Sequence, residues 1–137
     1  MKLVVGYDGS DNARRALERA SRLAAGDVVL VVSVVPLSAP GARGPAAVDA
    51  QQIEAHHKQL EEARKVLASH GADAQLIETL GNPIGDVADA LMHVARVHDA
   101  ELIVVGTRGL GMRKRLVVGS VSTKLVREAP CDVLVVR

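Results

Sequence analysis

The chain has 137 residues, of which 48% are hydrophobic, and its formal net charge at pH 7 is +1. These values predict one compact domain over residues 1–137, large enough to bury a core. Balanced charge and a single aromatic residue, Tyr7, argue against a nucleic-acid-binding protein, which needs cationic groups and stacking side chains. No stretch approaches the roughly 20 apolar residues of a membrane span, and the first apolar run is too short for a signal peptide. Cys131 is the only cysteine, so no intrachain disulfide forms and a cytoplasmic location is expected.

The first third of the chain predicts two strands separated by a helix. Residues 2–6 form a short apolar run that ends at Asp8-Gly9-Ser10, a cluster typical of turns and helix caps. A helical period of apolar residues follows and ends near Gly26. Its predicted buried face consists of Ala13, Ala16, Leu17, Ala20, Leu23 and Ala24. The run 28–35 is apolar on both faces and predicts an interior strand of a parallel sheet.

Residues 36–49 carry three prolines and two glycines and are predicted to form a mobile loop. A second helix is expected over residues 50–71, with Ile53, Leu60, Ala63 and Leu67 facing inward. His56 and His57 stand in the middle of this helix. Adjacent helical residues diverge by about 100°, so these two side chains do not chelate one metal and are interpreted as surface residues.

A third strand over residues 74–80 is more polar than the others, which suits the edge of a sheet. Asn82 as cap and Pro83 at the first helical position predict a third helix. The predicted buried face of that helix consists of Ile84, Val87, Ala88, Leu91, Val94 and Ala95.

Two further apolar runs, 102–105 and 133–136, predict the fourth and fifth strands. The helix between them is expected to face inward with Val121, Leu125 and Ala129, and to stop at Pro130. Cys131 follows this proline and is interpreted as a small buried filler.

A glycine-rich loop joins the fourth strand to the fourth helix. Its spacing is G-x2-G-x9-G-S, formed by Gly106, Gly109, Gly119 and Ser120. Glycines let backbone N–H groups approach a ligand, and a helix N-terminus favours negative charge. A phosphate chain is therefore the expected guest, although each glycine by itself is equally explained as a turn residue. The basic run Arg113-Lys114-Arg115 has three interpretations that stay open: a lid over phosphates, a partner-binding patch, or solvated surface.

Five buried strands alternating with helices predict a doubly wound, Rossmann-like α/β fold with a parallel sheet of order 3-2-1-4-5 and helices on both faces. The order reverses between strands one and four, so the loops after these two strands border one crevice. There Asp8 can accept from ribose hydroxyls or cap the first helix, and Val34 can cover a purine or be plain core. Ser120 and Ser122 can bind phosphate or cap the fourth helix.

The chain resembles the universal stress protein family over essentially its whole length. The resemblance is carried by Asp8-Gly9-Ser10 after the first strand, Gly106-Thr107-Arg108-Gly109 with the glycine spacing above, and Ala129-Pro130-Cys131 before the last strand. Members with the full glycine signature bind ATP on an adenine nucleotide alpha hydrolase-like fold. The resemblance implies contacts to adenine and ribose from Asp8 and Val34, backbone contacts from Gly6 and Tyr7, triphosphate and ribose contacts from Gly106, Arg108 and Gly109, and phosphate contacts from Gly119, Ser120, Val121 and Ser122. Any Mg²⁺ would be held mainly by the phosphates.

Three functions compete on these observations. A nucleotide-dependent regulatory or stress-response module is favoured, with an unidentified protein partner. A slow ATP-hydrolysing enzyme is the second, but hydrolysis needs a residue to orient water, and no catalytic residue is identified because no second carboxylate or histidine is expected at the crevice. A nucleotide-free interaction protein is the third, and the intact glycine spacing counts against it.

A homodimer is expected through the fifth strand. Its residues Val133, Leu134, Val135 and Val136 form an apolar run at the predicted sheet edge. Its only flanking charges are Asp132 and Arg137, so little blocks pairing with a second copy. The family resemblance implies the same contact. The alternative is that a helix or the loop 36–49 covers the edge.

Overall fold

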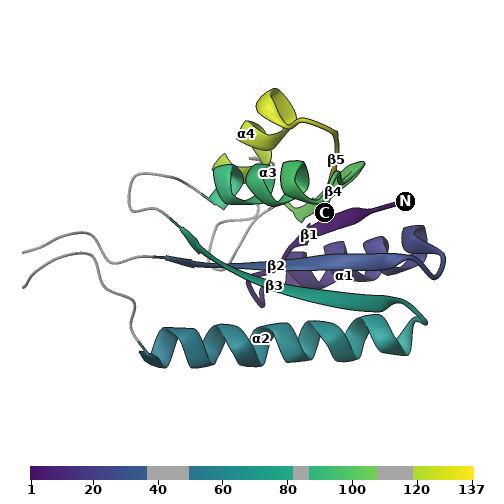
Figure 1. Cartoon of the computed structure of the whole chain (residues 1–137), viewed down its shortest axis with the longest axis vertical. Coiled ribbons are helices and arrows are strands. Elements are labelled where there is room, and N and C mark those ends of the chain that lie inside the picture. The colour runs from purple at the N-terminus through teal and green to yellow at the C-terminus, as the bar shows by residue number, and fades with distance from the viewer. Residues whose placement is uncertain (37–49, 82–86, 108–118) are drawn as a thin grey trace, which may run out of the picture.

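The computed structural model describes residues 1–36, 50–81, 87–107 and 119–137. Within these residues, strands and helices alternate along the chain (Figure 1). The strands are β1 (Leu3–Gly6), β2 (Val28–Pro36), β3 (Asp73–Gly81), β4 (Leu102–Gly106) and β5 (Asp132–Val136). The helices are α1 (Asp11–Ala24), α2 (Ala50–Ser69), α3 (Val87–Val97) and α4 (Ser120–Glu128). The predicted alternation is confirmed.

The strands form one parallel sheet in the order β3-β2-β1-β4-β5, as predicted. Leu3 of β1 is in register with Val29 of β2 on one side and Leu102 of β4 on the other. The polar strand β3 lies at one edge and the apolar strand β5 at the other. The order reverses at the β1–β4 pair, which sets the place where strand-end loops diverge and leave a crevice.

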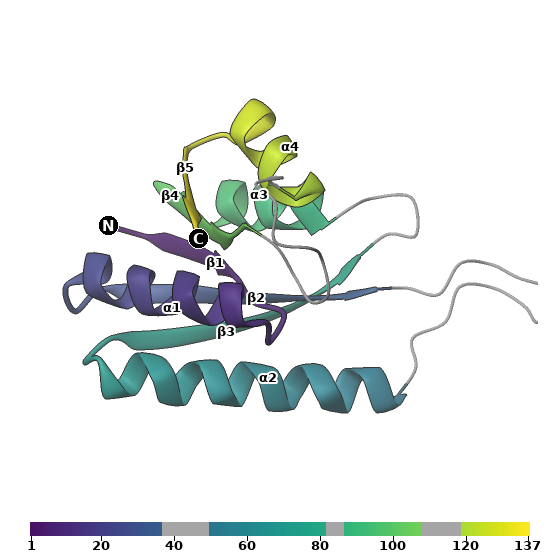
Figure 2. The ribbon, with the colours of Figure 1, turned by 180° about the vertical axis from the view of Figure 1, so that it is seen from behind.

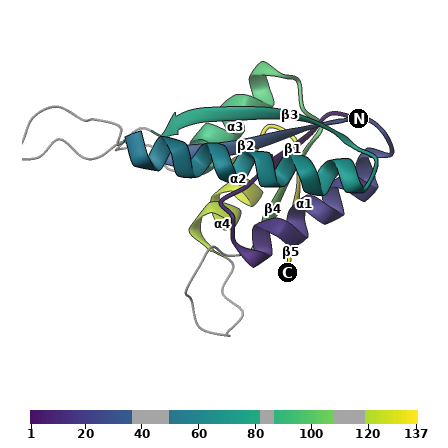
Figure 3. The ribbon, with the colours of Figure 1, turned by 90° about the horizontal axis from the view of Figure 1, so that it is seen from below.

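Helices cover both faces of the sheet. Helices α1 and α2 lie on one face and α3 and α4 on the other, as the two opposite side views show (Figure 2), and the view from below looks onto α1 and α2 (Figure 3). Successive strand residues point to opposite faces, so Leu3 and Val5 pack against α1 and α2, whereas Val4 packs against α3. Two cores made of aliphatic side chains therefore sandwich the sheet.

Two residues predicted to be buried are exposed. Leu23 is 41% exposed because it lies about 80° from the centre of the buried stripe of α1 at 100° per residue. Val87 is 40% exposed because it opens α3 beside a pocket rather than beside the core. The other described members of the two predicted stripes are buried: Ala13, Ala16, Leu17, Ala20 and Ala24 in α1, and Ala88, Leu91, Val94 and Ala95 in α3.

Several predictions concern segments outside the described residues: the loop over 37–49, the cap formed by Asn82 and Pro83 with Ile84 behind it, and the loop residues Arg108, Gly109 and Arg113-Lys114-Arg115. No helix among the described residues is both long and apolar enough to cross a membrane.

Candidate functional site

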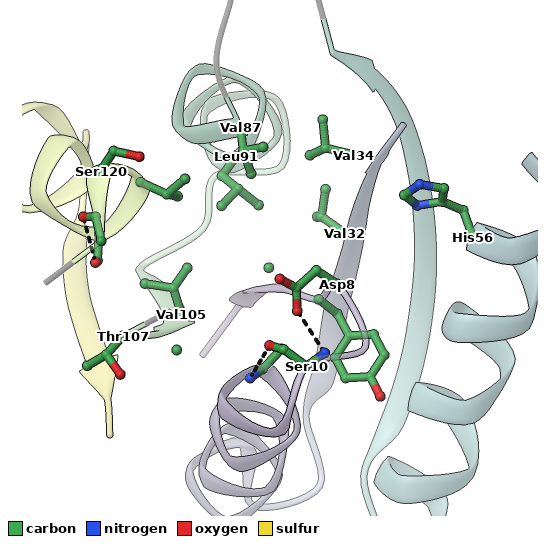
Figure 4. Close-up of a pocket in the computed structure, with 17 residues that line it drawn as sticks. Asp8, Ser10, Val32, Val34, His56, Val87, Leu91, Val105, Thr107 and Ser120 are labelled. Carbon is green, nitrogen blue, oxygen red and sulfur yellow. Dashed lines mark hydrogen bonds between the residues drawn. The ribbon is translucent and has the colours of Figure 1, made fainter. Parts of the chain in front are cut away.

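A pocket of about 410 Å³ opens at the carboxyl ends of β1 and β4, where the strand order reverses (Figure 4). Every predicted site residue that the structure describes lines it: Gly6, Tyr7, Asp8, Val34, Gly106, Gly119, Ser120, Val121 and Ser122. The two remaining predicted residues, Arg108 and Gly109, lie outside the described residues. The topology thus brings together the loops after β1 and β4 that the sequence places 100 positions apart, at residues 6 and 106.

The turn after β1 places a carboxylate in the middle of the pocket. Asp8 Oδ1 accepts a hydrogen bond from the Ser10 backbone N–H at 2.9 Å, which fixes the side chain (Figure 4). Ser10 is the N-cap of α1, and its Oγ accepts from the Ala13 N–H at 3.2 Å. The cap interpretation of Asp8 is therefore wrong, since Ser10 satisfies the helix donor and Asp8 closes the turn before it. Among the described residues, Asp8 Oδ2 has no hydrogen-bond partner and is left for a ligand.

Gly106 is required by a close approach between β4 and α1. A Cβ atom on Gly106 would lie 2.6 Å from the carbonyl carbon of Asn12 and 2.7 Å from its oxygen. Both are backbone atoms in the first turn of α1, which has little freedom to retreat. The missing side chain of Gly106 thus serves packing beneath the pocket, and it lets the N-terminal end of α1 reach the crevice.

The N-terminus of α4 forms the opposite wall. The Gly119 N–H donates to the Thr107 carbonyl at 3.0 Å, and the Thr107 N–H donates to the Val136 carbonyl at 2.9 Å. These bonds fasten the start of α4 to the end of β4. Gly119 is the N-cap and carries no capping side chain, so the first-turn N–H groups face the pocket without an internal acceptor among the described residues. The Ser122 hydroxyl donates to the Gly119 carbonyl at 3.1 Å, which leaves its backbone N–H as the group free for an anion.

Apolar side chains of β2, α3 and β4 line one part of the pocket. Val32 and Val34 at the end of β2 stand opposite Val87 and Leu91 of α3, and Val105 of β4 adjoins them (Figure 4). Such an apolar wall favours binding of a flat, weakly polar ring system, which can lie with one face against the valine and leucine side chains. The pocket therefore combines an anion-binding end, a central carboxylate and an apolar end.

His56 corrects the surface interpretation of the two histidines. Its side chain is half-buried, lines the pocket and forms a hydrogen bond of 2.5 Å between Nδ1 and Ser33 Oγ. Its neighbour His57 is exposed, as predicted, and its Nε2 lies 3.3 Å from Glu78 Oε2 of β3. The two histidines contact different groups, Ser33 and Glu78, in agreement with the prediction that their side chains diverge and do not chelate one metal. No group of histidine, cysteine and carboxylate side chains suited to a metal occurs in the described part of the chain.

Cys131 is half-buried rather than fully buried and packs beside the α3–α4 core. Burial, with a smaller contribution from the Asp132 carboxylate, raises the pKa of its thiol. The thiol form therefore dominates at neutral pH, which suits a packing residue and not a nucleophile.

Comparison with known proteins assigns the fold to a family. The family model described as Universal stress protein family matches residues 1–137. This chain belongs to the universal stress protein family. A universal stress protein from Thermus aquaticus is 40% identical over 144 residues, with 98% of this chain and 97% of that protein covered.

Two solved universal stress protein structures are complexes with nucleotides. The one from Archaeoglobus fulgidus in complex with dAMP is 26% identical, with a TM-score of 0.79 and coverage of 100% of this chain and 98% of that one. A second, in complex with cAMP, is 27% identical, with a TM-score of 0.76 and coverage of 100% and 97%.

Three polar residues that line this universal stress protein pocket, Ser10, His56 and Thr107, were not predicted as site residues. Thr107 lines the pocket and holds α4 through its carbonyl, although it stands between two residues that were singled out. His56 was missed because its partner comes from another element. A signal was present in Ser33, the one polar residue in the apolar run of 28–35, since a buried hydroxyl needs a hydrogen-bond partner.

Proposed function

We propose that this universal stress protein binds an adenine nucleotide, ATP in particular, in the strand-end pocket and acts as a nucleotide-dependent regulatory module. The observation that carries the proposal is the uncapped N-terminus of α4, which faces the same pocket as the Asp8 carboxylate. Two related structures are complexes with dAMP and cAMP, which supports adenine as the base.

The arrangement suggests how the nucleotide lies. Phosphates meet the backbone N–H groups of Ser120, Val121 and Ser122, where the helix dipole favours an anion. They pass over Gly119, which has no side chain to obstruct them and whose own N–H is bonded to the Thr107 carbonyl. The ribose hydroxyls donate to Asp8, and the base lies against Val34. Gly6 and Tyr7 contribute backbone contacts, and Gly106 lies beside the phosphate chain. The family resemblance gives the same role to Arg108 and Gly109, which lie outside the described residues. A volume of about 410 Å³ is within the usual range of small-molecule sites.

Binding without rapid turnover is the expected activity. Among the described residues that line the pocket, Asp8 is the one carboxylate and His56 the one imidazole. In Figure 4 His56 stands on the far side of the pocket from Ser120 and Thr107, and Asp8 lies between them. Hydrolysis needs a group that orients water at the terminal phosphate. In the proposed pose His56 lies away from the phosphates and the ribose hydroxyls occupy Asp8. Mg²⁺, when present, is held mainly by the phosphates. The proposed location is the cytoplasm, where adenine nucleotides are available.

We further propose that two copies associate through β5. This strand ends the sheet order, and Val133, Leu134, Val135 and Val136 are half-buried in the isolated chain. Pairing with a second β5 about a two-fold axis would satisfy the outer backbone groups and cover the remaining valine surface. The protein partner of the regulatory module would then bind a dimer.

Isothermal calorimetry tests the nucleotide site. Affinity is expected to rise from adenosine to AMP, ADP and ATP, because each added phosphate gains contacts at α4. Gly119→Val should weaken ATP binding more than tenfold and leave adenosine binding nearly unchanged. Gly119 has φ −61°, so its backbone accepts a side chain, and thermal unfolding verifies that the variant is folded. Undetectable ATP binding by the wild type, or equal ATP affinity for this variant, contradicts the proposal.

A further inference from the structure

His56 occupies a distinctive place in the pocket. It extends from α2 to Ser33 of β2, on the opposite face of the sheet from the Val32 and Val34 side chains, and it stands across the pocket from Ser120 (Figure 4). It is the one described polar side chain that α2 contributes to the pocket lining. It therefore lies away from the anion-binding end.

The partner of His56 determines which ring nitrogen carries the proton. Ser33 is 0% exposed, and its Oγ has no hydrogen-bond partner among the described residues other than His56 Nδ1. If Nδ1–H donated to Ser33, the serine hydroxyl hydrogen would be buried without an acceptor, which is costly. The arrangement that satisfies both groups has the Ser33 hydroxyl donating to an unprotonated Nδ1. The proton of neutral His56 is then on Nε2.

Nε2–H is consequently a donor with a fixed position. Among the described residues it has no partner, so a ligand in the pocket is its available acceptor. A ring nitrogen of a purine accepts such a hydrogen bond. The adjacent His57 does not line the pocket, and its Nε2 lies instead beside Glu78.

We infer that His56 is a specificity-determining residue that donates an Nε2–H hydrogen bond to a ring nitrogen of the bound purine, with Ser33 as the positioning residue that selects the donor tautomer. This inference rests on the proposed nucleotide function and deepens it, because it names the group that recognises the base. Loss of one buried, well-aligned hydrogen bond to a ligand corresponds to about a tenfold loss of affinity.

The test combines base analogues with histidine variants. ATP and its 1-deaza, 3-deaza and 7-deaza analogues, each of which replaces one ring nitrogen by C–H, are titrated into the wild type, His56→Ala and the control His57→Ala. One deaza analogue should bind the wild type and His57→Ala about tenfold more weakly than ATP. His56→Ala should bind ATP about tenfold more weakly and no longer distinguish that analogue from ATP, because the interaction is already absent.

A spectroscopic measurement on the wild type needs no variant. Long-range ¹⁵N–¹H spectra of labelled protein report the imidazole tautomer, and the His56 Nε2 signal should shift with ATP but not with inorganic tripolyphosphate or the discriminated analogue. Ser33→Ala should retain the imidazole but lose the fixed tautomer, with a smaller loss of ATP affinity than His56→Ala.

The outcomes separate the two proposals. Failure of the wild type to bind ATP overturns the proposed function. Binding of ATP by His56→Ala as tightly as by the wild type overturns the inference and leaves the proposed function intact. So does a wild type that binds all three deaza analogues like ATP, or a His56 signal that ATP leaves unmoved. An Nδ1–H tautomer in the free protein likewise contradicts the role given to Ser33.

Discussion

Gly106→Ala is expected to destabilise the protein, although alanine is a small residue and the backbone of Gly106 does not have a positive φ. The added Cβ would lie 2.6 Å from the Asn12 carbonyl carbon, 2.7 Å from its oxygen and 2.8 Å from its Cβ. Favourable carbon contacts are about 3.5–4.0 Å, so β4 and the first turn of α1 must separate by nearly 1 Å. This separation would disturb the packing of the whole of α1 on the sheet, because the obstructing atoms belong to the helix backbone.

The size of the effect follows from two opposing contributions. Overpacking of a core costs about 1–3 kcal/mol, and we take the upper value because the obstructing atoms are backbone. Replacing glycine lowers the entropy of the unfolded chain and returns about 0.4–1 kcal/mol. The net loss in the free energy of unfolding is about 2 kcal/mol. For 137 residues, with an unfolding entropy of about 2.1 cal/mol/K per residue, the midpoint Tm falls by about 7 °C.

Gly6→Ala is the matched control, because Gly6 ends the neighbouring strand and also lacks a positive φ. Its Cβ would lie 3.0 Å from Leu91 Cδ1 and 3.3 Å from Val105 Cγ1, which are ends of side chains. Ends of side chains can shift by a few tenths of an ångström more easily than helix backbone, so the loss should stay within about 1 kcal/mol.

Calorimetry and urea unfolding of the wild type and both variants provide the comparison. The variants should rank wild type, Gly6→Ala and then Gly106→Ala in both Tm and urea midpoint. A Gly106→Ala protein as stable as the wild type, or a Gly6→Ala protein that is the less stable of the two, would refute the argument that the Asn12 backbone excludes a side chain.

Three further predictions concern the site, the edge strand and the thiol. Asp8→Asn keeps an oxygen for the Ser10 N–H but removes the charge, so it should weaken ATP binding in calorimetry about tenfold at unchanged Tm; equal affinity excludes Asp8 from the site. Wild-type protein should be a dimer and Val135→Lys a folded monomer in light scattering with circular dichroism, and a monomeric wild type contradicts pairing through β5. Burial raises the pKa of Cys131, so the midpoint of its alkylation rate against pH should be higher in the native protein than in urea; coincident profiles contradict this.

Local sequence determined the elements and their order. The period of apolar residues in 11–24 and 87–97, the continuous runs of 28–35 and 102–105, and the turn at Asp8-Gly9-Ser10 are short-range patterns, and the structure contains the element that each predicts. The sheet order followed because alternating strands and helices permit few arrangements. The same reasoning located the pocket, since a doubly wound sheet has its crevice where the order reverses. The loops that begin at Tyr7 and Gly106 could therefore be predicted to border one pocket.

Only the tertiary structure decided what those residues contact. Gly106 reads as a phosphate-binding glycine, yet the atoms nearest to its missing Cβ belong to Asn12, 94 positions earlier. Val87 has the period of a core residue but borders the pocket. His56 reads as a surface residue until α2 packs on β2 and brings it to Ser33. Periodicity specifies which face of an element is buried, whereas the identity of the neighbour depends on how remote elements pack, and no local pattern encodes that.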